Sequence, residues 1–364
     1  MVGMSLTVDI TGVPPERMLF AASPLAELTA MLHVLASPSH HPARLSWATR
    51  VRAGLQPDLA ERLNEAEFLW RSSRADFLLP SHPSGSLEEE LDALDKLDDD
   101  LYVTSALVTT CGSDRMLFNT PSPLVDSASH ARALEQAQAR GPQQAAFAER
   151  LMADPPMVRA RVRKTLEACG PAFFDETWQR VRPHLATDLR LKADLLARRG
   201  LAETLSSVSP ALSLDESRHR IVMDKLQDNS TSAVGDGVTF IPSVFGDPHL
   251  VCVHAPGWRP VLQYPVSANA LGAPVPLDQI RLRLDALAHP VRMRLIRTLA
   301  RGPHTTGELA AAWELTPPEV SRHLAVLRKA GLLSTHRRGR YVHYELDAMI
   351  TATLGTDLLE ALLR

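Results

Sequence analysis

The sequence predicts an α+β protein, with a mainly helical N-terminal body and a section of short strands ahead of a small basic C-terminal domain. Between about residues 14 and 205, apolar residues recur three and four positions apart, which is the spacing of amphipathic helices. Short apolar runs divided by Gly, Pro, Asp and Asn then occupy residues 211–266 and indicate strands. Residues 280–345 hold 12 Lys/Arg against 5 Asp/Glu, a net charge of +7, whereas residues 1–279 hold 26 against 34, a net charge of −8. One short segment therefore carries the positive charge, as expected for a module that meets a polyanion.

The length and composition of the chain limit its class. With 364 residues it is long enough for at least two domains. No apolar run approaches the roughly 18 residues of a membrane span, and the start of the chain lacks the pattern of an export signal. We therefore expect a cytoplasmic protein without membrane contact. Cys111, Cys169 and Cys252 are odd in number and far apart, which favours reduced, buried thiols over disulfides or a four-cysteine zinc site.

The N-terminal α+β domain is expected to span residues 1–266 and to be helical to about residue 205. Prolines such as those at Ser37-Pro38 and Asp154 to Pro156 interrupt its helices. Strands are expected at Met4–Ile10, Ala211–Leu214, His219–Met223, Gly237–Phe245, Leu250–His254 and Pro260–Tyr264. The run Leu87–Leu101 has eight acidic residues and predicts one solvated amphipathic helix with Leu87, Leu91, Leu94 and Leu101 turned inward. An acidic metal-binding cluster is the alternative for this run.

Residues 267–277, rich in Ala, Gly and Pro, predict a linker to a second domain at 278–346, and residues 347–364 predict a C-terminal helix. Helical spacing runs from Leu284 to Leu299, with a new helix expected to begin at Pro290. Thr305 stands three residues before Glu308, and Thr316 three residues before Glu319, which is the spacing of a reciprocal capping box. The sequence therefore predicts a short helix to about Trp313 and another from Pro317 to Ala330, ended by Gly331.

The helix Pro317–Ala330 is the one expected in the major groove of DNA, because it closes a two-helix unit joined by a short turn. At 100° per residue one of its faces is apolar and the opposite face is short or cationic. The apolar face holds Val320, Leu324 and Leu327, and the opposite face holds Pro318, Arg322, Ala325 and Lys329, flanked by Ser321, His323 and Arg328. Arginine can donate two hydrogen bonds to guanine, and small side chains permit close approach to base edges.

A hairpin is predicted after this helix, from Leu332 through the turn Arg338-Gly339 to Leu346. Its tip carries three arginines that would meet phosphate or a minor groove. Together these elements predict a winged helix-turn-helix. The residues expected to contact double-stranded DNA are Thr316, Pro318, Ser321, Arg322, His323, Arg328, Lys329, Arg337, Arg338 and Arg340.

The order of motifs in this domain resembles the ArsR/SmtB family of bacterial repressors. The residues that carry the resemblance are His289-Pro290-Val291-Arg292, Glu308-Leu309-Ala310, Ser321 to Leu327, Ala330 to Leu333 and Tyr341 to Tyr344. The resemblance implies a homodimer on a roughly two-fold operator, with the helix Ala348–Leu363 as a dimerisation helix. Ahead of the winged helix-turn-helix, the chain resembles more loosely an uncharacterised domain of actinobacterial regulators. This second resemblance implies no known ligand. We therefore expect a repressor whose effector is non-metal or absent, and an unknown small molecule could bind the N-terminal domain.

No cofactor and no metal site are expected. The family's metal sensing does not carry over, because the short helix Glu308 to Trp313 has no cysteine and the tail lacks histidine pairs. His249, Cys252 and His254 share one expected strand, but His249 would face away from the other two. His33, His40 and His41 are expected at a helix end and in a loop rather than as ligands.

Two other classes of function stay open. One is an enzyme with a regulatory winged-helix tail, although the sequence contains no Gly-x-Gly-x-x-Gly, no phosphate-binding Gly-Lys-Ser/Thr loop, no Gly-x-Ser-x-Gly and no His-Glu-x-x-His. The other is a protein-interaction module whose winged helix contacts protein. The +7 charge of the basic segment argues against the second, and we expect no enzyme activity.

Overall fold

The computed structural model describes residues 5–71, 74–112, 120–224, 229–255, 258–266, 275–338, 341–347, 350–351, 354–355 and 357–358. The chain divides into two compact units, Met1–Leu271 and Gly272–Arg364, hereafter the N-terminal unit and the C-terminal unit. Each has a hydrophobic core of its own. Of the expected linker 267–277, residues 267–274 lie outside the described residues, and Leu277 already belongs to a helix.

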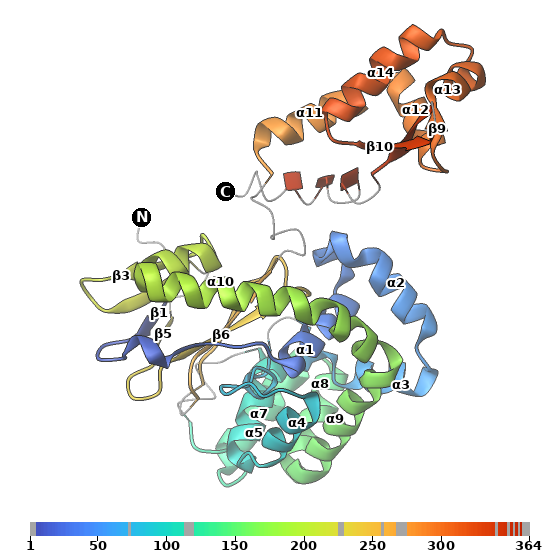
Figure 1. Ribbon diagram of the computed structural model, residues 1–364. Helices are drawn as coiled ribbons and strands as arrows, with labels where there is room; N and C mark the ends of the chain where they lie inside the picture. The colour runs from blue at the N-terminus through green and yellow to red at the C-terminus, as the bar shows by residue number, and fades with distance from the viewer. Residues whose placement is uncertain are drawn as a thin grey trace. The chain divides into compact units, whose positions relative to one another are not determined.

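Helices make up most of the N-terminal unit (Figure 1). They are α1 (Pro24–Ala36), α2 (Leu45–Gly54), α3 (Pro57–Glu65), α4 (Leu87–Asp95), α5 (Asp99–Cys111), α7 (Ser127–Arg140), α8 (Pro142–Ala153), α9 (Pro155–Cys169) and α10 (Asp175–Val208). In Figure 1, α4, α5, α7, α8 and α9 gather on one side of the unit, and α10 crosses in front of the strands. Helix α10 bends at Gly200, whose φ of 80° and ψ of −177° are not helical.

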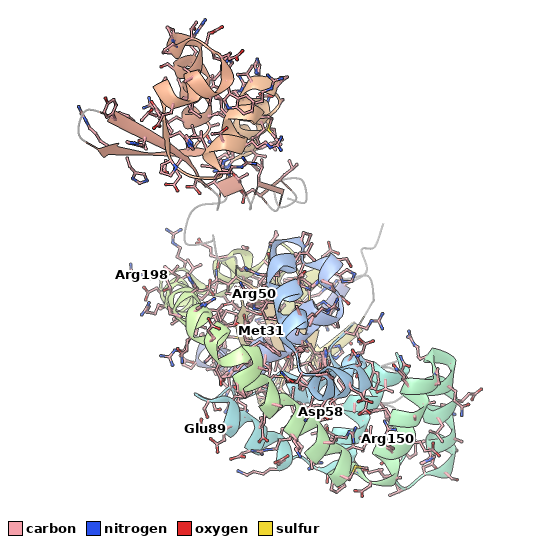
Figure 2. All side chains as sticks on the ribbon, turned by 90° about the vertical axis from the view of Figure 1, so that its right-hand side faces the viewer. Met31, Arg50, Asp58, Glu89, Arg150 and Arg198 are labelled. Atoms are coloured by element: carbon pink, nitrogen blue, oxygen red, sulfur yellow. The ribbon has the colours of Figure 1, made fainter. Side chains whose placement is uncertain are left out.

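Helix α1 is the central element of this unit. Every residue from Pro24 to Leu35 is buried, because the segment is apolar on all sides. Figure 2 shows Met31 inside the unit, whereas charged side chains such as Asp58 and Glu89 lie at its surface. Ionisable residues on α1, such as Glu27 and His33, are therefore buried as well and must find partners within the protein.

Two four-stranded sheets complete the N-terminal unit, with the strand orders β3-β4-β1-β5 and β2-β6-β8-β7. The strands are β1 (Ser5–Asp9), β2 (Met18–Phe20), β3 (Leu212–Asp215), β4 (Arg220–Asp224), β5 (Asn229–Ser232), β6 (Val238–Ser243), β7 (Val251–Val253) and β8 (Val261–Pro265). Strand β6 is buried along its whole length and pairs in parallel with β2 and β8. Continuous burial explains why its apolar residues do not alternate with exposed ones, and it also buries the polar Thr239 and Ser243.

The predicted α+β fold is confirmed, and each of the six expected strands is present with shifted ends. In the N-terminal unit, two of the described strands were missed. Strand β2 is only three residues long, and β5 is made of Asn, Ser and Thr, so neither gives an apolar pattern. The expectation of one helix over 87–101 was wrong, because Asp98 accepts a hydrogen bond of 2.9 Å from the backbone N–H of Asp100 and begins a new helix. Leu91 and Leu94 are buried as expected, whereas Leu87 and Leu101 are half-buried.

The C-terminal unit contains four helices and a three-stranded sheet among its described residues. They are α11 (Leu277–Leu287), α12 (Pro290–Leu299), β9 (His304–Thr305), α13 (Thr306–Trp313), α14 (Pro317–Lys329), β10 (Leu333–Arg338) and β11 (Tyr341–Leu346). Strand β11 pairs antiparallel with both β10 and β9. In the expected tail helix, the described residues 350–351, 354–355 and 357–358 are helical, and the others lie outside the described part.

Cys111 and Cys169 are buried free thiols, and burial raises the pKa of both, to about 11 and about 12. Cys252 is half-buried. Within the described ranges, no helix combines the length and apolar character that a membrane crossing requires.

Candidate nucleic-acid interface

Two capping boxes fix where the helices of the candidate interface begin. At α13, the N–H of Glu308 donates to Thr305 Oγ1 at 3.2 Å, and the N–H of Thr305 donates to Glu308 Oε2 at 2.7 Å. At α14, the N–H of Thr316 and its hydroxyl both donate to Glu319 Oε2, at 3.0 and 2.7 Å. These hydrogen bonds from backbone N–H groups hold the pKa of Glu308 and Glu319 below its usual range. Both helix starts are therefore fixed by local hydrogen bonds.

A short turn separates α13 from α14. Glu314 adopts a left-handed conformation with φ of 53°, and the N–H of Leu315 donates to the carbonyl of Ala310 at 3.0 Å. The N–H of Glu314 donates to the same carbonyl, so two donors close the end of α13. Trp313 anchors the same end, since its indole N–H donates to Thr298 Oγ1 on α12 at 3.0 Å.

One face of α14 packs into the core of the C-terminal unit. Val320, Leu324 and Leu327 are at most 1% exposed and contact apolar side chains of α12 and α13 in one cluster. Gly331 ends the helix with φ of 77°, and Gln279 on α11 donates to the carbonyl of Ala330 at 3.0 Å. The predicted apolar face is confirmed, and its burial decides which face points outward.

The opposite face of α14 is exposed and cationic. The exposed members of the predicted DNA-contact set on this helix and its N-cap are Thr316, Pro318, Ser321, Arg322, Arg328 and Lys329. His323 is half-buried, and its ring lies 4.9 Å from that of His289 between ring centres. Burial lowers the pKa of His323, and the positive charges of His289, Arg292 and Arg322 act in the same direction. An imidazole that is neutral at pH 7 can both donate and accept a hydrogen bond.

Strands β10 and β11 form the predicted wing. Their register pairs Thr335 with Tyr344 and Arg337 with Val342, and the side chain of Arg337 is exposed. Arg338 ends β10, but its side chain lies outside what the structure describes, as does the whole of Arg340.

Part of the positive charge of this unit is used inside it. Arg283 is buried and pairs with Asp357 at 2.8 Å. The guanidinium of Arg292 donates to the carbonyls of Ala286 and Asp285, at 2.6 and 2.9 Å. Arg294, Arg297 and Arg301 of the same unit are exposed, so the cations of α14 and the wing belong to a larger set of exposed positive charges.

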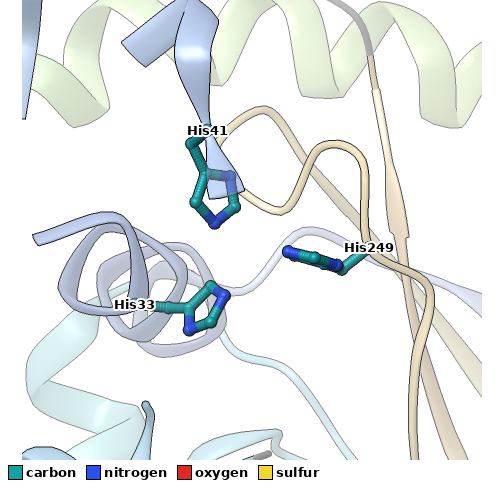
Figure 3. A group of neighbouring side chains, drawn as sticks. All are labelled: His33, His41 and His249. Carbon is teal, nitrogen blue, oxygen red and sulfur yellow. The ribbon is translucent and has the colours of Figure 1, made fainter. Parts of the chain in front are cut away.

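The structure also brings together residues that the sequence analysis kept apart. His249 was weighed with Cys252 and His254 as a metal site, but it instead meets His33 and His41 in the interior of the N-terminal unit (Figure 3). One imidazole nitrogen of each lies within 4.8 Å of the other two. The expectation of no metal-ligating group missed this cluster. The available sign was that His33 lies in a helix that is apolar on all sides, where an ionisable residue needs partners.

Comparison with protein families accounts for both units. A family model described as a family of unknown function (DUF5937) matches residues 4–270, which is most of the chain. The chain belongs to the DUF5937 family. A second model, described as a helix-turn-helix domain, matches residues 287–336 of this DUF5937 protein, from the end of α11 into β10. The predicted two-part resemblance is confirmed, and the C-terminal unit is a winged helix-turn-helix of the ArsR type.

Relatives of this DUF5937 protein match its C-terminal part. A biofilm growth-associated repressor of Agrobacterium fabrum is 40% identical over 68 residues, and the transcriptional repressor SdpR of Bacillus subtilis is 31% identical over 65 residues. These matches cover 19% and 18% of this chain, and 58% and 72% of the two relatives. Among solved structures, the repressor BigR of Xylella fastidiosa is similar, with 32% identity, a TM-score of 0.20, and coverage of 23% of this chain and 85% of that one. The family matches and the curated relatives together support a DNA-binding regulator.

Proposed function

We propose that this DUF5937 protein is a transcriptional repressor that binds a two-fold operator as a homodimer. In this proposal α14 enters the major groove and contacts bases, and the β10–β11 hairpin contacts phosphate. The observation that carries the proposal is the division of α14 into a buried face and an exposed face. Val320, Leu324 and Leu327 are buried, while Arg322, Arg328 and Lys329 are exposed with no ion pair among the described residues.

The positions of these groups support separate roles. Arg322 and Ser321 lie in the first half of α14, and residues near the N-terminus of a recognition helix are those that reach base edges. Arg328 and Lys329 lie in its last turn, where they suit phosphate contacts. Arg337, Arg338 and Arg340 would add phosphate or minor-groove contacts at the hairpin. Of these three, Arg338 and Arg340 enter the proposal from the sequence alone.

The homodimer is supported by apolar side chains that the C-terminal unit leaves exposed. Leu277 and Leu284 lie seven residues apart on one face of α11 and are 56% and 41% exposed. Side chains of this kind on one helical face are suited to burial against a second copy. Leu354, by contrast, is 8% exposed within the same chain. Light scattering on the purified chain checks the proposal, and a monomer at micromolar concentration would contradict the dimer.

The DNA contacts are tested by footprinting the region upstream of the protein's own gene, followed by fluorescence anisotropy on the protected site. Arg322→Ala is expected to weaken binding to this site by about 1–3 kcal/mol and to leave binding to unrelated DNA nearly unchanged. Arg337→Ala is expected to weaken binding to all DNA similarly and to reduce the slope of log affinity against log salt by about 1.

Arg281→Ala is the matched control. Arg281 is an exposed arginine of the same unit, lies on α11, and faces only Asp285 at 3.9 Å among the ion pairs of the described residues. Its loss removes the same charge outside the proposed interface. Equal, salt-independent losses for the three variants would contradict the assignment of α14 to the major groove.

A further inference from the structure

The ring nitrogens of the three clustered histidines are oriented by the protein backbone. His33 lies in α1, His41 lies between the 3-10 turns Pro38–His40 and Pro42–Arg44, and His249 lies between β6 and β7. Nδ1 of His33 is 3.1 Å from the carbonyl oxygen of Trp70, and Nδ1 of His41 is 2.6 Å from that of Asp247. A carbonyl oxygen only accepts, so both Nδ1 atoms carry the hydrogen. In the neutral rings, Nε2 is therefore the atom with the lone pair.

Two of these rings make the hydrogen bond to a backbone carbonyl that is typical of metal-binding histidines. In such sites the ligating ring donates its other N–H to a carbonyl or carboxylate, which fixes its tautomer and orientation. His33 and His41 already make these bonds. Figure 3 shows the three rings converging on a common point from three separate segments. Nitrogen ligands around a tetrahedral zinc ion lie roughly 3.4 Å apart at bond lengths of about 2.0–2.1 Å. The ligand atoms of the three histidines lie within 4.8 Å of one another and would have to move closer to reach that separation.

Burial keeps the rings in the form that binds metal. His33 and His41 are 3% and 2% exposed. Burial lowers the pKa of His33 to about 3, with Arg74, His41 and His249 acting in the same direction. Burial also lowers the pKa of His41. Both rings are therefore neutral at physiological pH, as a metal ligand must be.

One of the imidazole nitrogens of the cluster has no hydrogen-bond partner among the described residues. It is Nε2 of His41, which is buried. Leaving such an acceptor buried and unsatisfied costs free energy, which a bound ion would recover. The rings also contact one another edge to face, with centres 4.9 to 5.2 Å apart. Packing by itself does not account for the cluster, because apolar side chains would fill the same space without an unsatisfied nitrogen.

Two arginines and two acids lie around the cluster, and burial raises the pKa of both acids, that of Glu27 to about 7. Arg74 is buried and donates to the same Trp70 carbonyl at 2.9 Å. In addition to burial, its positive charge and that of Arg44 both lower the pKa of His41, so both oppose a cation. Arg44 lies over the ring of Phe245. Glu27 and Asp247 are the acids that interact with these two arginines. His40, whose ring centre is 5.9 Å from that of His249, stands at the exposed edge.

We propose that the N-terminal unit binds one divalent transition-metal ion, with zinc as the first candidate, through His33, His41 and His249. An all-imidazole donor set suits Zn²⁺ and neighbouring first-row ions rather than Mg²⁺ or Ca²⁺. Three protein ligands leave a fourth position for water or another ligand. The ion would join α1 to the segments around residues 38–44 and 243–250. The proposal does not depend on DNA binding.

The test uses the untagged full chain, stripped with a chelator and titrated with ZnCl₂ by calorimetry in the absence of DNA. We expect one high-affinity Zn²⁺ per chain. His41→Gln and His249→Gln should each weaken binding by at least ~100-fold, because loss of an outer-shell partner already costs 10–100-fold. His82→Gln, on an exposed residue of the same unit, and His323→Gln, beside His289 in the C-terminal unit, should change nothing. Circular dichroism confirms that each variant is folded.

Cobalt loading of the wild-type chain provides a second measurement that needs no variant. Co²⁺ in a tetrahedral nitrogen site absorbs differently from the octahedral aqua ion, so the intact chain should give the tetrahedral spectrum. Absence of binding, which a water-filled pocket would give, overturns the proposal. So does binding that survives His41→Gln and His249→Gln or is lost in His323→Gln. If both cluster variants unfold, an aqua-like cobalt spectrum of the wild type overturns it.

Discussion

Single buried side chains join elements that are distant in sequence. Glu90 of α4 is 2% exposed, and its carboxylate accepts hydrogen bonds from Ser23 Oγ and the N–H of Leu25 at 2.8 and 2.7 Å. It also accepts one from the N–H of Ser84 at 3.0 Å. A carboxylate from another helix thereby satisfies a free N–H at the start of α1. Burial nevertheless raises the pKa of Glu90 to about 7, even though these hydrogen bonds lower it.

The raised pKa of Glu90 predicts a pH dependence of stability. The folded chain holds the proton more tightly than the unfolded chain, whose pKa is near 4.5. The contribution of Glu90 is therefore fully present below pH 4.5 and is lost as the pH rises through about 7. We expect the free energy of unfolding of the wild type to fall, relative to that of Glu90→Gln, over this range. Urea unfolding at several pH values measures the difference, and a difference independent of pH would contradict the prediction.

A single glycine is required where β6 begins beside β2. Gly237 has a φ of 92°, and a Cβ atom there would lie 2.3 Å from the carbonyl oxygen of Arg17. We expect Gly237→Ala to lower the stability of the N-terminal unit by about 1–3 kcal/mol or more, through strain and this clash. Gly235→Ala is the control, since Gly235 has a similar φ of 88° but no atom within 4 Å of the added Cβ. Thermal unfolding should show a clearly larger loss for Gly237→Ala, and equal losses would rule out the clash.

At the scale of elements, helices α1 and α14 differ in how their apolar residues are distributed around the helix axis. Helix α1 is buried all round and carries its ionisable residues into the core. Helix α14 is amphipathic, buries three apolar residues and presents cations outward. Its N-terminus is closed by the Thr316–Glu319 capping box, a set of hydrogen bonds within the helix itself.

The capping box gives a prediction for the C-terminal unit. Thr316→Ala removes the hydroxyl that donates to Glu319, so we expect a loss of about 1 kcal/mol in the stability of this unit. Ser321→Ala is the control, because Ser321 is an exposed residue inside the same helix and alanine favours helix there. Thermal unfolding compares the two variants. A loss for Ser321→Ala as large as for Thr316→Ala would mean that the capping box does not stabilise α14.

At the scale of the whole molecule, the chain has two separate cores. The core clusters of the N-terminal unit share no residue with the core of the C-terminal unit. Within the C-terminal unit, the buried pair Arg283–Asp357 ties α11 to the tail, with both side chains at most 10% exposed. The loss of one partner from such a pair leaves a buried charge without its counter-charge.

Two independent cores predict two unfolding transitions in calorimetry. Asp357→Ala should lower only the transition of the C-terminal unit, by about 3–5 kcal/mol, because Arg283 stays buried and uncompensated. The double variant Arg283→Met with Asp357→Leu should recover most of this loss. Gly237→Ala should lower only the other transition. A single cooperative transition that both variants lower equally would contradict independent units.

The sequence by itself determined the features that depend on neighbouring residues. The capping boxes at Thr305 and Thr316, the two faces of α14 and the β10–β11 hairpin all follow from spacings of a few residues. These features were predicted with their residues, as was the basic charge of residues 280–345. Helix and hairpin patterns are local, since the side chains that define them are brought together by the repeat of the backbone itself.

Only the tertiary structure decided which buried polar groups meet. Glu90 reaches Leu25 across 65 residues, and His41 reaches Asp247 across 206. His33, His41 and His249 share no sequence pattern, and the sequence led us to weigh His249 only with Cys252 and His254. Their meeting depends on how α1, the turns after it and the segment between β6 and β7 pack. That packing is set by the burial of apolar surface over the whole unit. The hydrophobic effect is non-directional, so it leaves no regular spacing of residues in the sequence from which these contacts could be predicted.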